Sequence, residues 1–356
     1  MTACVGIIGC GQLAQMMAEA ARRLGIDTVF LCSNETPVVE GLGTIYNESQ
    51  VDAFVAASDA ITVERENVPH DILRQAAAVG LYPGYDALET LRHRHSQKAL
   101  LDRLEIPTSP WRAVDSADAL PGLFRELGGV RLRCKTSLGG YDGGGQWRVD
   151  READGDVIPD SGYPLIAEAE VAIDREYAIL VARDRAGAIL CYPLTENLMR
   201  DGILTCSLMP AAADDSVREQ AQRHATALVN ALDYVGVLAV EFFLSGDQLM
   251  VNEIAPRVHN TGHWSLNACR CDQFEQHIRA VSGHGLIAPE PTQAAAMVNL
   301  LGDRLPASMP EGPLRIMMQT YGKSIRPGRK LGHLTILGND IEPVRAAALE
   351  MLEALQ

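Results

Sequence analysis

The amino-terminal segment combines two strand patterns and one helix pattern around a glycine-rich turn. Residues 5–9 form a short apolar run that leads into the turn Gly9-Cys10-Gly11-Gln12-Leu13-Ala14. Apolar residues then recur at helical spacing over residues 13–24, and a second strand pattern covers residues 28–31. A strand, a helix and a strand in this order predict a βαβ unit with parallel strands. The chain is therefore expected to open with a Rossmann-like domain.

The same turn formally satisfies the fingerprint of dinucleotide-binding proteins. Ala14 would be the third small residue, and Glu35 could bind the ribose. Glycine is also needed in such turns for packing alone, so NAD binding is one hypothesis and a structural turn is the other. A further strand pattern, residues 60–63, ends in Glu64 and Glu66. Acids at such a strand end lie where open α/β sheets bind ligands, with a solvated helix start as the alternative.

Composition limits the classes of function. The 356 residues exceed one core of typical size, so two or three domains are expected. A formal net charge of -15 argues against general affinity for nucleic acid or an anionic membrane. No apolar run reaches the roughly 18 residues that span a bilayer, and no signal peptide is expected. The eight cysteines are scattered, which is typical of free thiols in a reducing compartment, so a cytoplasmic location is expected.

A glycine-rich loop follows a strand pattern that ends in a lysine. Residues 130–135 alternate as a strand and end at Lys135, residues 139–145 contain five glycines, and a second strand pattern covers residues 147–149. Consecutive backbone amides in such a loop can hold an anion, and the lysine adds a positive charge suited to phosphates. A mobile hairpin tip is the alternative. The Gly-Lys-Ser/Thr order of a Walker loop is missing, so a phosphate site here would differ from a P-loop.

Two acids occur on neighbouring strand patterns late in the chain. Glu241 lies in the first pattern and Glu253 at the end of the second, with the turn signal Ser245-Gly246-Asp247 between them. A hairpin can bring such acids together. Two carboxylates beside the amide of Asn252 suit a hard divalent cation such as magnesium. The alternative is an ordinary hairpin with two solvated glutamates, followed by a polar loop over residues 256–263.

Basic residues are concentrated in two places of an otherwise acidic chain. Residues 88–104 form one helix pattern whose basic positions, including Arg94 and Lys98, are expected by default to be solvated. Near the end of the sequence, a proline-glycine turn displays Lys323, Arg326, Arg329 and Lys330. A local charge that opposes the net charge favours a phosphate clamp at this turn. A solubilising surface turn is the alternative.

Seven motifs occur together and in a fixed order. They are Gly-Cys-Gly-Gln-Leu (9–13), Glu-Arg-Glu-Asn-Val-Pro (64–69), Gly-Gly-Tyr-Asp-Gly-Gly-Gly-Gln-Trp (139–147), Tyr-Pro-Leu-Thr-Glu-Asn (192–197), Asp-Gly-Ile-Leu (201–204), Asn-Glu-Ile-Ala-Pro-Arg-Val-His-Asn-Thr-Gly-His-Trp (252–264) and Arg-Pro-Gly-Arg-Lys-Leu-Gly-His (326–333). Over nearly its whole length the chain resembles the ATP-grasp enzymes and, among them, the N5-carboxyaminoimidazole ribonucleotide synthetase family of purine biosynthesis. The last two motifs are specific to that family rather than to the fold.

The resemblance implies an architecture and a reaction. The fold would be α/β, with α+β character in the ATP-grasp part. It would comprise a Rossmann-like domain (1–104), a small β-rich lid with the glycine-rich loop (105–170), and a catalytic domain that includes the basic turn (171–356). ATP, bicarbonate and 5-aminoimidazole ribonucleotide would give the N5-carbamate, ADP and phosphate through carboxyphosphate. Mg²⁺ would be the metal, and the chain would be a homodimer that binds neither nucleic acid nor membrane.

The resemblance also assigns residues by position. ATP would be held by Arg94, Lys135, Gly140, Tyr141, Asp142, Gly143, Gly144, Gly145, Gln146, Glu168, Ala169, Glu170, Val171, Glu176, Asn252 and Glu253. Within this set, residues 168–171 would form the adenine hinge. The metal would bind Glu241 and Glu253. The ribonucleotide would contact Glu64, Tyr141, Asp142, His259, Lys323 and Arg329. The implied catalytic groups are Lys135, Asp142, which would orient or deprotonate the amine, and Arg257, which would stabilise carboxyphosphate.

Three positions depart from the family pattern and keep other hypotheses open. Gly144 stands where a basic residue is usual, Met199 where a histidine is common, and Ala14-Gln15 where Gly-Arg is usual. An ATP-grasp ligase with another acceptor is one competing hypothesis, and a catalytically silent nucleotide-binding homologue is a second. An NAD-dependent dehydrogenase built on the first glycine turn is a third.

Overall fold

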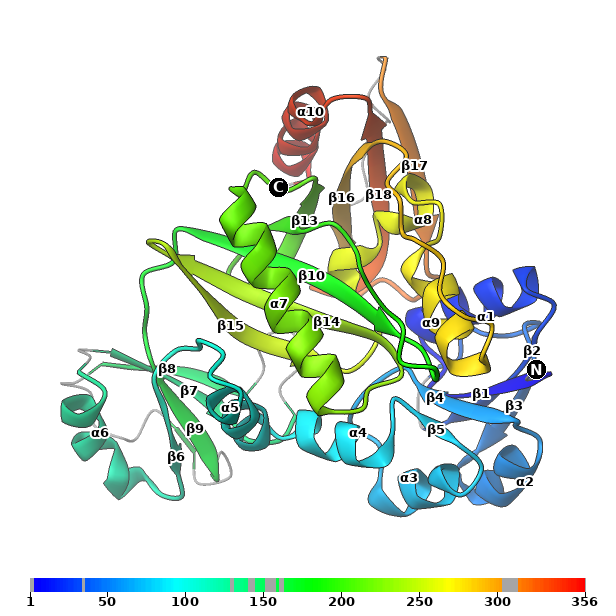
Figure 1. Cartoon of the computed structure of the whole chain (residues 1–356), viewed down its shortest axis with the longest axis horizontal. Helices are drawn as coiled ribbons and strands as arrows, with labels where there is room; N and C mark the ends of the chain where they lie inside the picture. The colour runs from blue at the N-terminus through cyan, green and yellow to red at the C-terminus, as the bar shows by residue number, and fades with distance from the viewer. Residues whose placement is uncertain are drawn as a thin grey trace.

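The computed structural model describes residues 3–33, 36–128, 131–139, 145–150, 158–159, 163–302 and 313–355. Their strands form three sheets. Figure 1 shows the first sheet at the lower right, the lid at the lower left and the large sheet between and above them. This mixed α/β architecture confirms the predicted fold class. The predicted domain boundaries at residues 104 and 170 stay a prediction.

The amino-terminal sheet is parallel, as the βαβ pattern predicts. Its order is β3-β2-β1-β4-β5, and each pair of neighbours is parallel. The strands are β1 (Cys4–Ile8), β2 (Asp27–Cys32), β3 (Thr44–Asn47), β4 (Ala60–Val63) and β5 (Leu81–Tyr82). The helices are α1 (Gln12–Arg23), α2 (Val51–Ala56), α3 (His70–Ala77) and α4 (Tyr85–Arg92). The helix predicted after the glycine turn is therefore confirmed as α1.

Two cysteines of this domain correct the expectation of eight free thiols. Cys10, in the glycine turn after β1, is joined by a disulfide to Cys32 at the end of β2, with the two Cα atoms 5.6 Å apart. Because β1 and β2 are neighbours, residues 22 apart in the sequence meet at one edge of the sheet. The remaining cysteines are free.

The basic helix pattern also needs a correction. It covers two helices, α4 and α5 (Arg94–Arg103), because His93 between them is extended, with φ -101° and ψ 118°. His93 forms an isolated bridge with Leu138, so the lid interrupts the helix. The prediction of a solvated basic face is wrong for Arg94 and Lys98, which are both buried.

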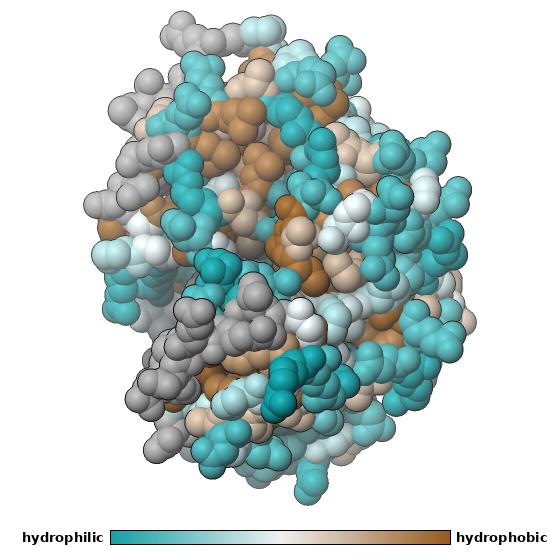
Figure 2. All heavy atoms as spheres, turned by 90° about the vertical axis from the view of Figure 1, so that its left-hand side faces the viewer, coloured by the Kyte–Doolittle hydropathy of each residue, from teal (hydrophilic) through white to brown (hydrophobic). Residues whose placement is uncertain are grey.

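The lid is a small antiparallel sheet with one helix. Its order is β6-β9-β7-β8. Its elements are β6 (Trp111–Val114), α6 (Leu120–Glu126), β7 (Arg131–Thr136), β8 (Gln146–Asp150) and β9 (Leu165–Ala169). A buried cluster that includes Phe124 and Leu132 fills the space between α6 and the sheet. In Figure 2, which faces the lid side, apolar side chains gather above the lid, over the central sheet.

The central sheet is antiparallel and carries the predicted hairpin. Its order is β15-β14-β10-β12-β13-β16-β18-β17, and β11 also pairs with β10. The strands are β10 (Arg175–Arg183), β11 (Ile189–Cys191), β12 (Thr195–Arg200), β13 (Ile203–Met209), β14 (Gly236–Ser245), β15 (Gln248–Ala255), β16 (Ala294–Leu301), β17 (Arg315–Thr320) and β18 (Lys330–Gly338). The basic turn lies between β17 and β18, the last two strands of this sheet.

Four helices accompany the central sheet, and they join it to the first domain. They are α7 (Asp215–Ala231), α8 (Ser265–Ala268), α9 (Gln273–Ser282) and α10 (Ile341–Ala354). Helix α7 lies across β10, α10 covers β16 and β18, and α9 lies beside α1 (Figure 1). Trp264, Phe274 and Met17 belong to one buried cluster that spans this junction. In the described part of the chain, none of the helices combines the length and the apolar character that crossing a membrane requires.

Candidate active site

Glu241 and Glu253 are paired across the β14–β15 hairpin, with a bulge next to Glu241. Paired residues of antiparallel strands project from the same face. Burial raises the pKa of the Glu241 carboxyl to about 8, with further contributions from Glu253 and Glu176. A divalent cation would offset this repulsion.

Two carboxylates are a suitable donor set for magnesium. Mg²⁺ usually binds one or two carboxylates and completes its shell with water and phosphate oxygens. Among the described residues, no group of three or more His, Cys, Asp and Glu side chains could hold a metal ion. The hairpin acids therefore fit a metal that a bound nucleotide also coordinates, rather than a closed protein cage.

A buried carboxylate joins two lysines where the lid meets α5. Glu168 on β9 lies 2.6 Å from Lys135 Nζ on β7 and is also paired with Lys98 on α5. Burial raises the pKa of Glu168, but Lys135 and Lys98 together lower it to about 2. Burial lowers the pKa of Lys98. Glu168 was predicted as part of the adenine hinge, whereas Lys98 was missed, because a helix pattern does not show which side another domain covers.

The same lysine reaches the hairpin. Lys135 Nζ lies 3.4 Å from Asn252 Oδ1, and Arg94 Nη1 lies 3.3 Å from Glu253 Oε2. The lid, α5 and β15 therefore bring four of the predicted ATP ligands together. Glu176 lies on β10, the neighbour of β14, and burial raises its pKa to about 7.

The loop after β15 brings an arginine to the acids of the first domain. Arg257 Nε lies 3.0 Å from Glu66 Oε2. Burial raises the pKa of Glu66, yet Arg257 and hydrogen bonds lower it overall. A cavity of about 20 Å³ is lined by Glu66, Arg94, Glu253 and Gly139, among others. Glu66 was not among the predicted site residues, although its position after β4 was the available signal.

His259 lies between the acid pair and the first domain. Its Nε2 atom is 3.6 Å from Glu241 Oε1, and its Nδ1 atom is 3.1 Å from Thr261 Oγ1. Burial, followed by the charge of Arg257, lowers the pKa of His259 well below its usual value. The ring is therefore neutral near pH 7.

Glu64 occupies the start of α1. Its carboxylate accepts hydrogen bonds from Gly11 N at 2.6 Å and Leu13 N at 3.1 Å. Gly9 has φ +123°, and a Cβ there would lie 2.5 Å from a Glu64 oxygen, so the close approach requires glycine. The amides that bind pyrophosphate in dinucleotide-binding proteins are therefore taken by a side chain, which argues against NAD.

The basic turn approaches the start of α1 on the other side. Lys323 Nζ donates a hydrogen bond to Gln12 Oε1. Arg329 is exposed, and its Nη1 donates to Ser324 Oγ at 2.7 Å. Lys330 acts electrostatically on Glu241 and His259, so a cation that the sequence-based assignment left out also faces the acid pair.

Some predicted residues lie elsewhere or outside the described part. Glu170 pairs with Arg131, Arg133 and Arg148 on the lid surface. Ala169 ends β9, Val171 follows it, and Gly145 and Gln146 lie at the start of β8. Outside the described residues lie Glu35 and the loop residues Gly140, Tyr141, Asp142, Gly143 and Gly144.

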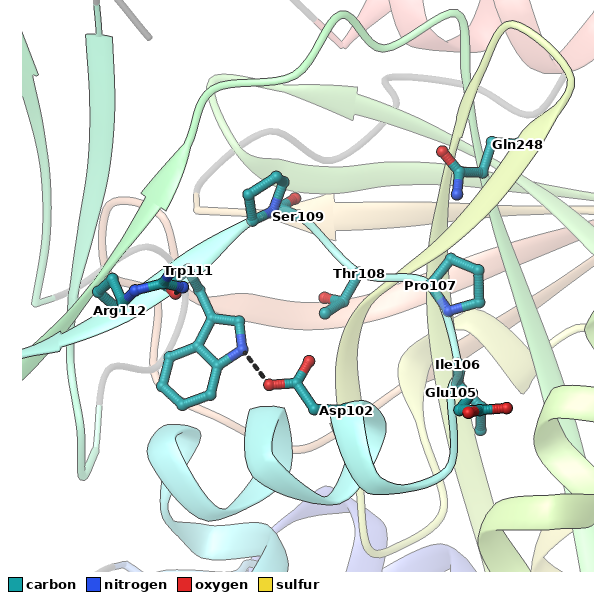
Figure 3. Close-up of a pocket in the computed structure, with 10 residues that line it drawn as sticks. Asp102, Glu105, Ile106, Pro107, Thr108, Ser109, Trp111, Arg112 and Gln248 are labelled. Carbon is teal, nitrogen blue, oxygen red and sulfur yellow. Dashed lines mark hydrogen bonds between the residues drawn. The ribbon is translucent and has the colours of Figure 1, made fainter. Parts of the chain in front are cut away.

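A larger cavity lies away from these residues. Its volume is about 360 Å³, and it is lined by the end of α5 and the segment that leads into β6 (Figure 3). Trp111 Nε1 donates a hydrogen bond to Asp102 Oδ2 at 3.1 Å across it. None of the predicted site residues lines this cavity, so it marks the joint between the lid and α5 rather than the predicted active site.

Three family descriptions match successive parts of the chain. They are the ribonucleotide synthetase preATP-grasp domain at residues 1–92, the ATP-grasp domain at 99–274, and the phosphoribosylaminoimidazole carboxylase C-terminal domain at 295–347. The N5-carboxyaminoimidazole ribonucleotide synthase of Brucella melitensis is 40% identical over 347 residues, which cover 93% of this chain and 95% of the relative.

Solved structures agree over the full length. The N5-carboxyaminoimidazole ribonucleotide synthetase from Thermus thermophilus has a TM-score of 0.90 and 35% identity, covering 98% of each chain. The N5-carboxyaminoimidazole synthase from Aspergillus clavatus, in complex with ADP and 5-aminoimidazole ribonucleotide, has a TM-score of 0.88 and 27% identity, covering 99% of this chain and 98% of that one. The resemblance inferred from the seven motifs is thereby confirmed. This chain belongs to the N5-carboxyaminoimidazole ribonucleotide synthase family of ATP-grasp enzymes.

Proposed function

We propose that this protein is an ATP-dependent ligase that carboxylates 5-aminoimidazole ribonucleotide with bicarbonate. The products are N5-carboxyaminoimidazole ribonucleotide, ADP and phosphate, as in purine biosynthesis. The observation that carries the proposal is the position of the acid pair Glu241 and Glu253, between the lysines of the lid side and the loop with Arg257 and His259. The complex of the Aspergillus clavatus relative with ADP and the ribonucleotide supports both ligands.

The first step is phosphoryl transfer to bicarbonate. A bicarbonate oxygen forms a bond to the γ-phosphorus of ATP, the bond to the bridging oxygen breaks, and ADP leaves. Such a step needs positioning and neutralised charge more than covalent help. Arg94, Lys98 and Lys135 lie within one set of contacts and would supply positive charge to the phosphates. Magnesium held by Glu241 and Glu253 would neutralise further charge on the phosphate oxygens.

The second step is capture of the activated carboxyl. The amine nitrogen forms a bond to the carboxyl carbon, the bond to the phosphate oxygen breaks, and phosphate leaves. Asp142 is assigned to take the amine proton, and Arg257 to hold the carboxyphosphate. Glu66, at 3.0 Å, fixes the guanidinium of Arg257. Carboxyphosphate is labile in water, so closure of the glycine-rich lid over it would protect the intermediate.

The acceptor is assigned to the space between the first domain and the basic turn. Glu64, Tyr141, Asp142 and His259 would face the ribonucleotide, and Lys323 and Arg329 would bind its 5′-phosphate. The approach of Lys323 to Gln12 supports this, because it brings the turn to the start of α1. A cytoplasmic homodimer is part of the proposal, and light scattering of the purified protein tests the dimer.

Phosphate release from ATP tests the function. We expect release with bicarbonate to rise when 5-aminoimidazole ribonucleotide is added, with equal formation of the N5-carbamate. Stimulation by a different acceptor alone would indicate a ligase of other specificity. No turnover with any acceptor, together with retained ATP binding, would indicate a silent homologue. A thermal shift with NADH would favour a dehydrogenase, and none is expected, because Glu64 holds the amides at the start of α1.

A further inference from the structure

A single buried glutamine holds the main chain of His259 from both sides. Gln273 is the first residue of α9 and is fully buried. Its Oε1 accepts a hydrogen bond from His259 N at 2.8 Å, and its Nε2 donates to His259 O at 2.7 Å. A side-chain amide here replaces the two hydrogen bonds that a neighbouring strand would supply. The loop after β15 thereby has a fixed main chain at its centre.

The same glutamine fixes the end of the loop. Gln273 Nε2 lies 3.0 Å from His263 Nδ1, and Gln273 N donates to Ser265 Oγ, which in turn donates to Gly262 O at 2.6 Å. A Cβ at Gly262 would overlap Leu180 and lie 3.0 Å from Gln273 Oε1. Only glycine allows the loop to lie this close to the amide.

Fixing the main chain of His259 also fixes where its ring points. Nδ1 accepts a hydrogen bond from Thr261 N at 3.4 Å, which leaves Nε2 directed at Glu241 Oε1, 3.6 Å away. His259 therefore stands between the proposed metal acids and the proposed acceptor pocket. Gln273 is directed at the loop rather than at either ligand, so it would act only through His259.

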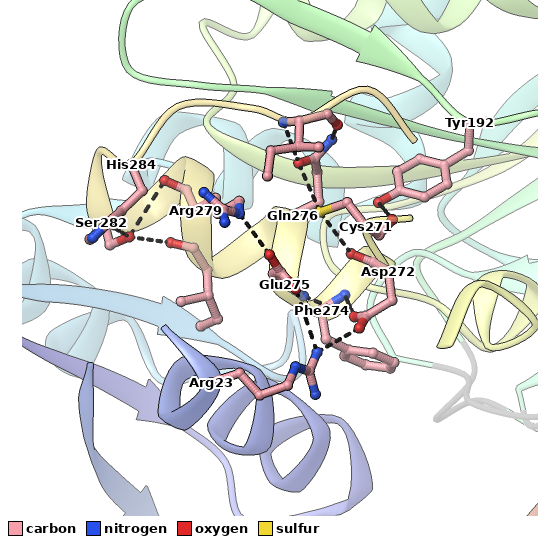
Figure 4. A network of polar contacts seen from close by, with 12 residues as sticks. Arg23, Tyr192, Cys271, Asp272, Phe274, Glu275, Gln276, Arg279, Ser282 and His284 are labelled. Atoms are coloured by element: carbon pink, nitrogen blue, oxygen red, sulfur yellow. Dashed lines mark hydrogen bonds and ion pairs between the residues drawn. The ribbon is translucent and has the colours of Figure 1, made fainter. Parts of the chain in front are cut away.

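The start of α9 is anchored to the first domain. Asp272 accepts hydrogen bonds from Phe274 N and Glu275 N, both at 2.9 Å, and from Arg23 of α1 at 2.6 Å (Figure 4). The other end of α1 carries Gln12, which Lys323 contacts. One helix therefore ties together the anchor of His259 and the basic turn, which lie on two sides of the acceptor pocket.

We propose that Gln273 is a positioning residue for acceptor capture. By holding His259 in place, it keeps the ribonucleotide aligned with the activated carboxyl, so that phosphate release is coupled to carbamate formation. This inference rests on the proposed function. A displacement of about 1 Å at such a site can cost about 100-fold in rate.

Gln276 offers a matched control on the same helix. It is equally buried, and its amide makes the same two-sided contact with another main chain, donating to Ile287 O at 2.6 Å and accepting from Ile287 N at 3.0 Å (Figure 4). Ile287 lies in the segment after α9, away from the loop of His259. Gln276→Met and Gln273→Met therefore each remove two main-chain hydrogen bonds from the same helix.

The experiment compares the full-length variants in steady-state kinetics and thermal unfolding. For Gln273→Met we expect the KM for 5-aminoimidazole ribonucleotide to rise about 10- to 100-fold, with the KM for ATP within about twofold, and phosphate released in excess of carbamate. For Gln276→Met we expect a similar fall in Tm without these changes. Equal effects of both variants on the acceptor KM, or full coupling in Gln273→Met, would overturn the positioning role.

Ser265→Ala provides a milder variant in case Gln273→Met does not fold. It removes the hydroxyl that links Gln273 N to Gly262 O. A several-fold rise in the acceptor KM is expected, and an unchanged value would count against the inference. The wild-type arm tests the function separately. A wild type without ribonucleotide-stimulated phosphate release overturns the proposed function and this inference together, whereas an active wild type with unaffected variants overturns this inference alone.

Discussion

Arg94 Nη1 lies 3.3 Å from Glu253 Oε2, so a cation from α5 and an acid from β15 meet at one point. Glu253 is also the cross-strand partner of Glu241. A proposed metal acid is therefore already in contact with a proposed phosphate-binding cation. This relationship makes Glu253 the most sensitive position for a test of the metal assignment.

Glu253→Gln should lower kcat by about 1000-fold or more, because the amide is a poor magnesium ligand and leaves Arg94 with a neutral neighbour. The measurement is phosphate release over a range of Mg²⁺ concentrations, with calorimetric titration of Mg²⁺-nucleotide as a second readout. Asp247→Asn is the control, since Asp247 is exposed in the turn of the same hairpin. A Glu253→Gln enzyme with full activity would remove the metal assignment.

Glu168→Gln should lower the free energy of unfolding by about 3 kcal/mol, because it leaves two buried lysines without a charged partner. Urea denaturation measures the change. Glu170→Gln, on the lid surface two residues away, should change it by less than about 1 kcal/mol. Comparable losses in the two variants would contradict a special role of the buried pair.

The same pair predicts a dependence on pH. The pKa of Glu168 falls from 4.5 to about 2 on folding, so its ionised form stabilises the fold above pH 4.5 and this contribution is lost as the pH falls towards 2. The difference in stability between wild type and Glu168→Gln should be constant near neutral pH and shrink below pH 4.5. A difference that grows in acid would refute the sign of this linkage.

Arg329→Ala should raise the KM for the ribonucleotide about tenfold or more, with kcat little changed, because a phosphate contact far from the reacting carbon supports binding in the ground state and transition state alike. Steady-state kinetics with the ribonucleotide as the varied substrate measures this. Arg326→Ala removes the same charge from the same exposed turn and is the control. If both variants behave alike, the turn contributes only general attraction.

Glu176 should make nucleotide affinity depend on pH. Burial raises its pKa to about 7, and only the ionised carboxylate accepts hydrogen bonds from both ribose hydroxyls. Affinity for a non-hydrolysable ATP analogue should therefore rise about tenfold between pH 6 and pH 8. Calorimetry measures it, and Glu176→Gln serves as the reference, since titration of the nucleotide itself is common to both proteins. Parallel pH profiles would exclude this role.

The elements that could be predicted from the sequence are those fixed by local pattern. The βαβ opening and the pairing of Glu241 with Glu253 follow from strand periodicity and a turn signal, and both are confirmed. Residue roles for ATP, acceptor and metal remain predictions. They came from motifs rather than from geometry.

What escaped prediction depends on contacts between distant segments. Lys98 is buried because the lid places Glu168 beside it, and no helical pattern contains that fact. The break at His93 lacks glycine or proline, and it arises from the bridge to Leu138 on the lid side. Cys10 and Cys32 meet because their strands are neighbours, whereas cysteine spacing alone suggested free thiols.

The two lysines on Glu168 have a consequence for which anions the enzyme admits. Their charges are already balanced by an internal carboxylate, so a triphosphate has to exchange with that carboxylate rather than simply neutralise a positive pocket. An isolated phosphate or a stray polyanion gains little from such an exchange, and the net charge of -15 repels it from a distance. Selectivity for ATP thus begins before the adenine is recognised, in an electrostatic threshold that only a ligand with several simultaneous contacts can cross.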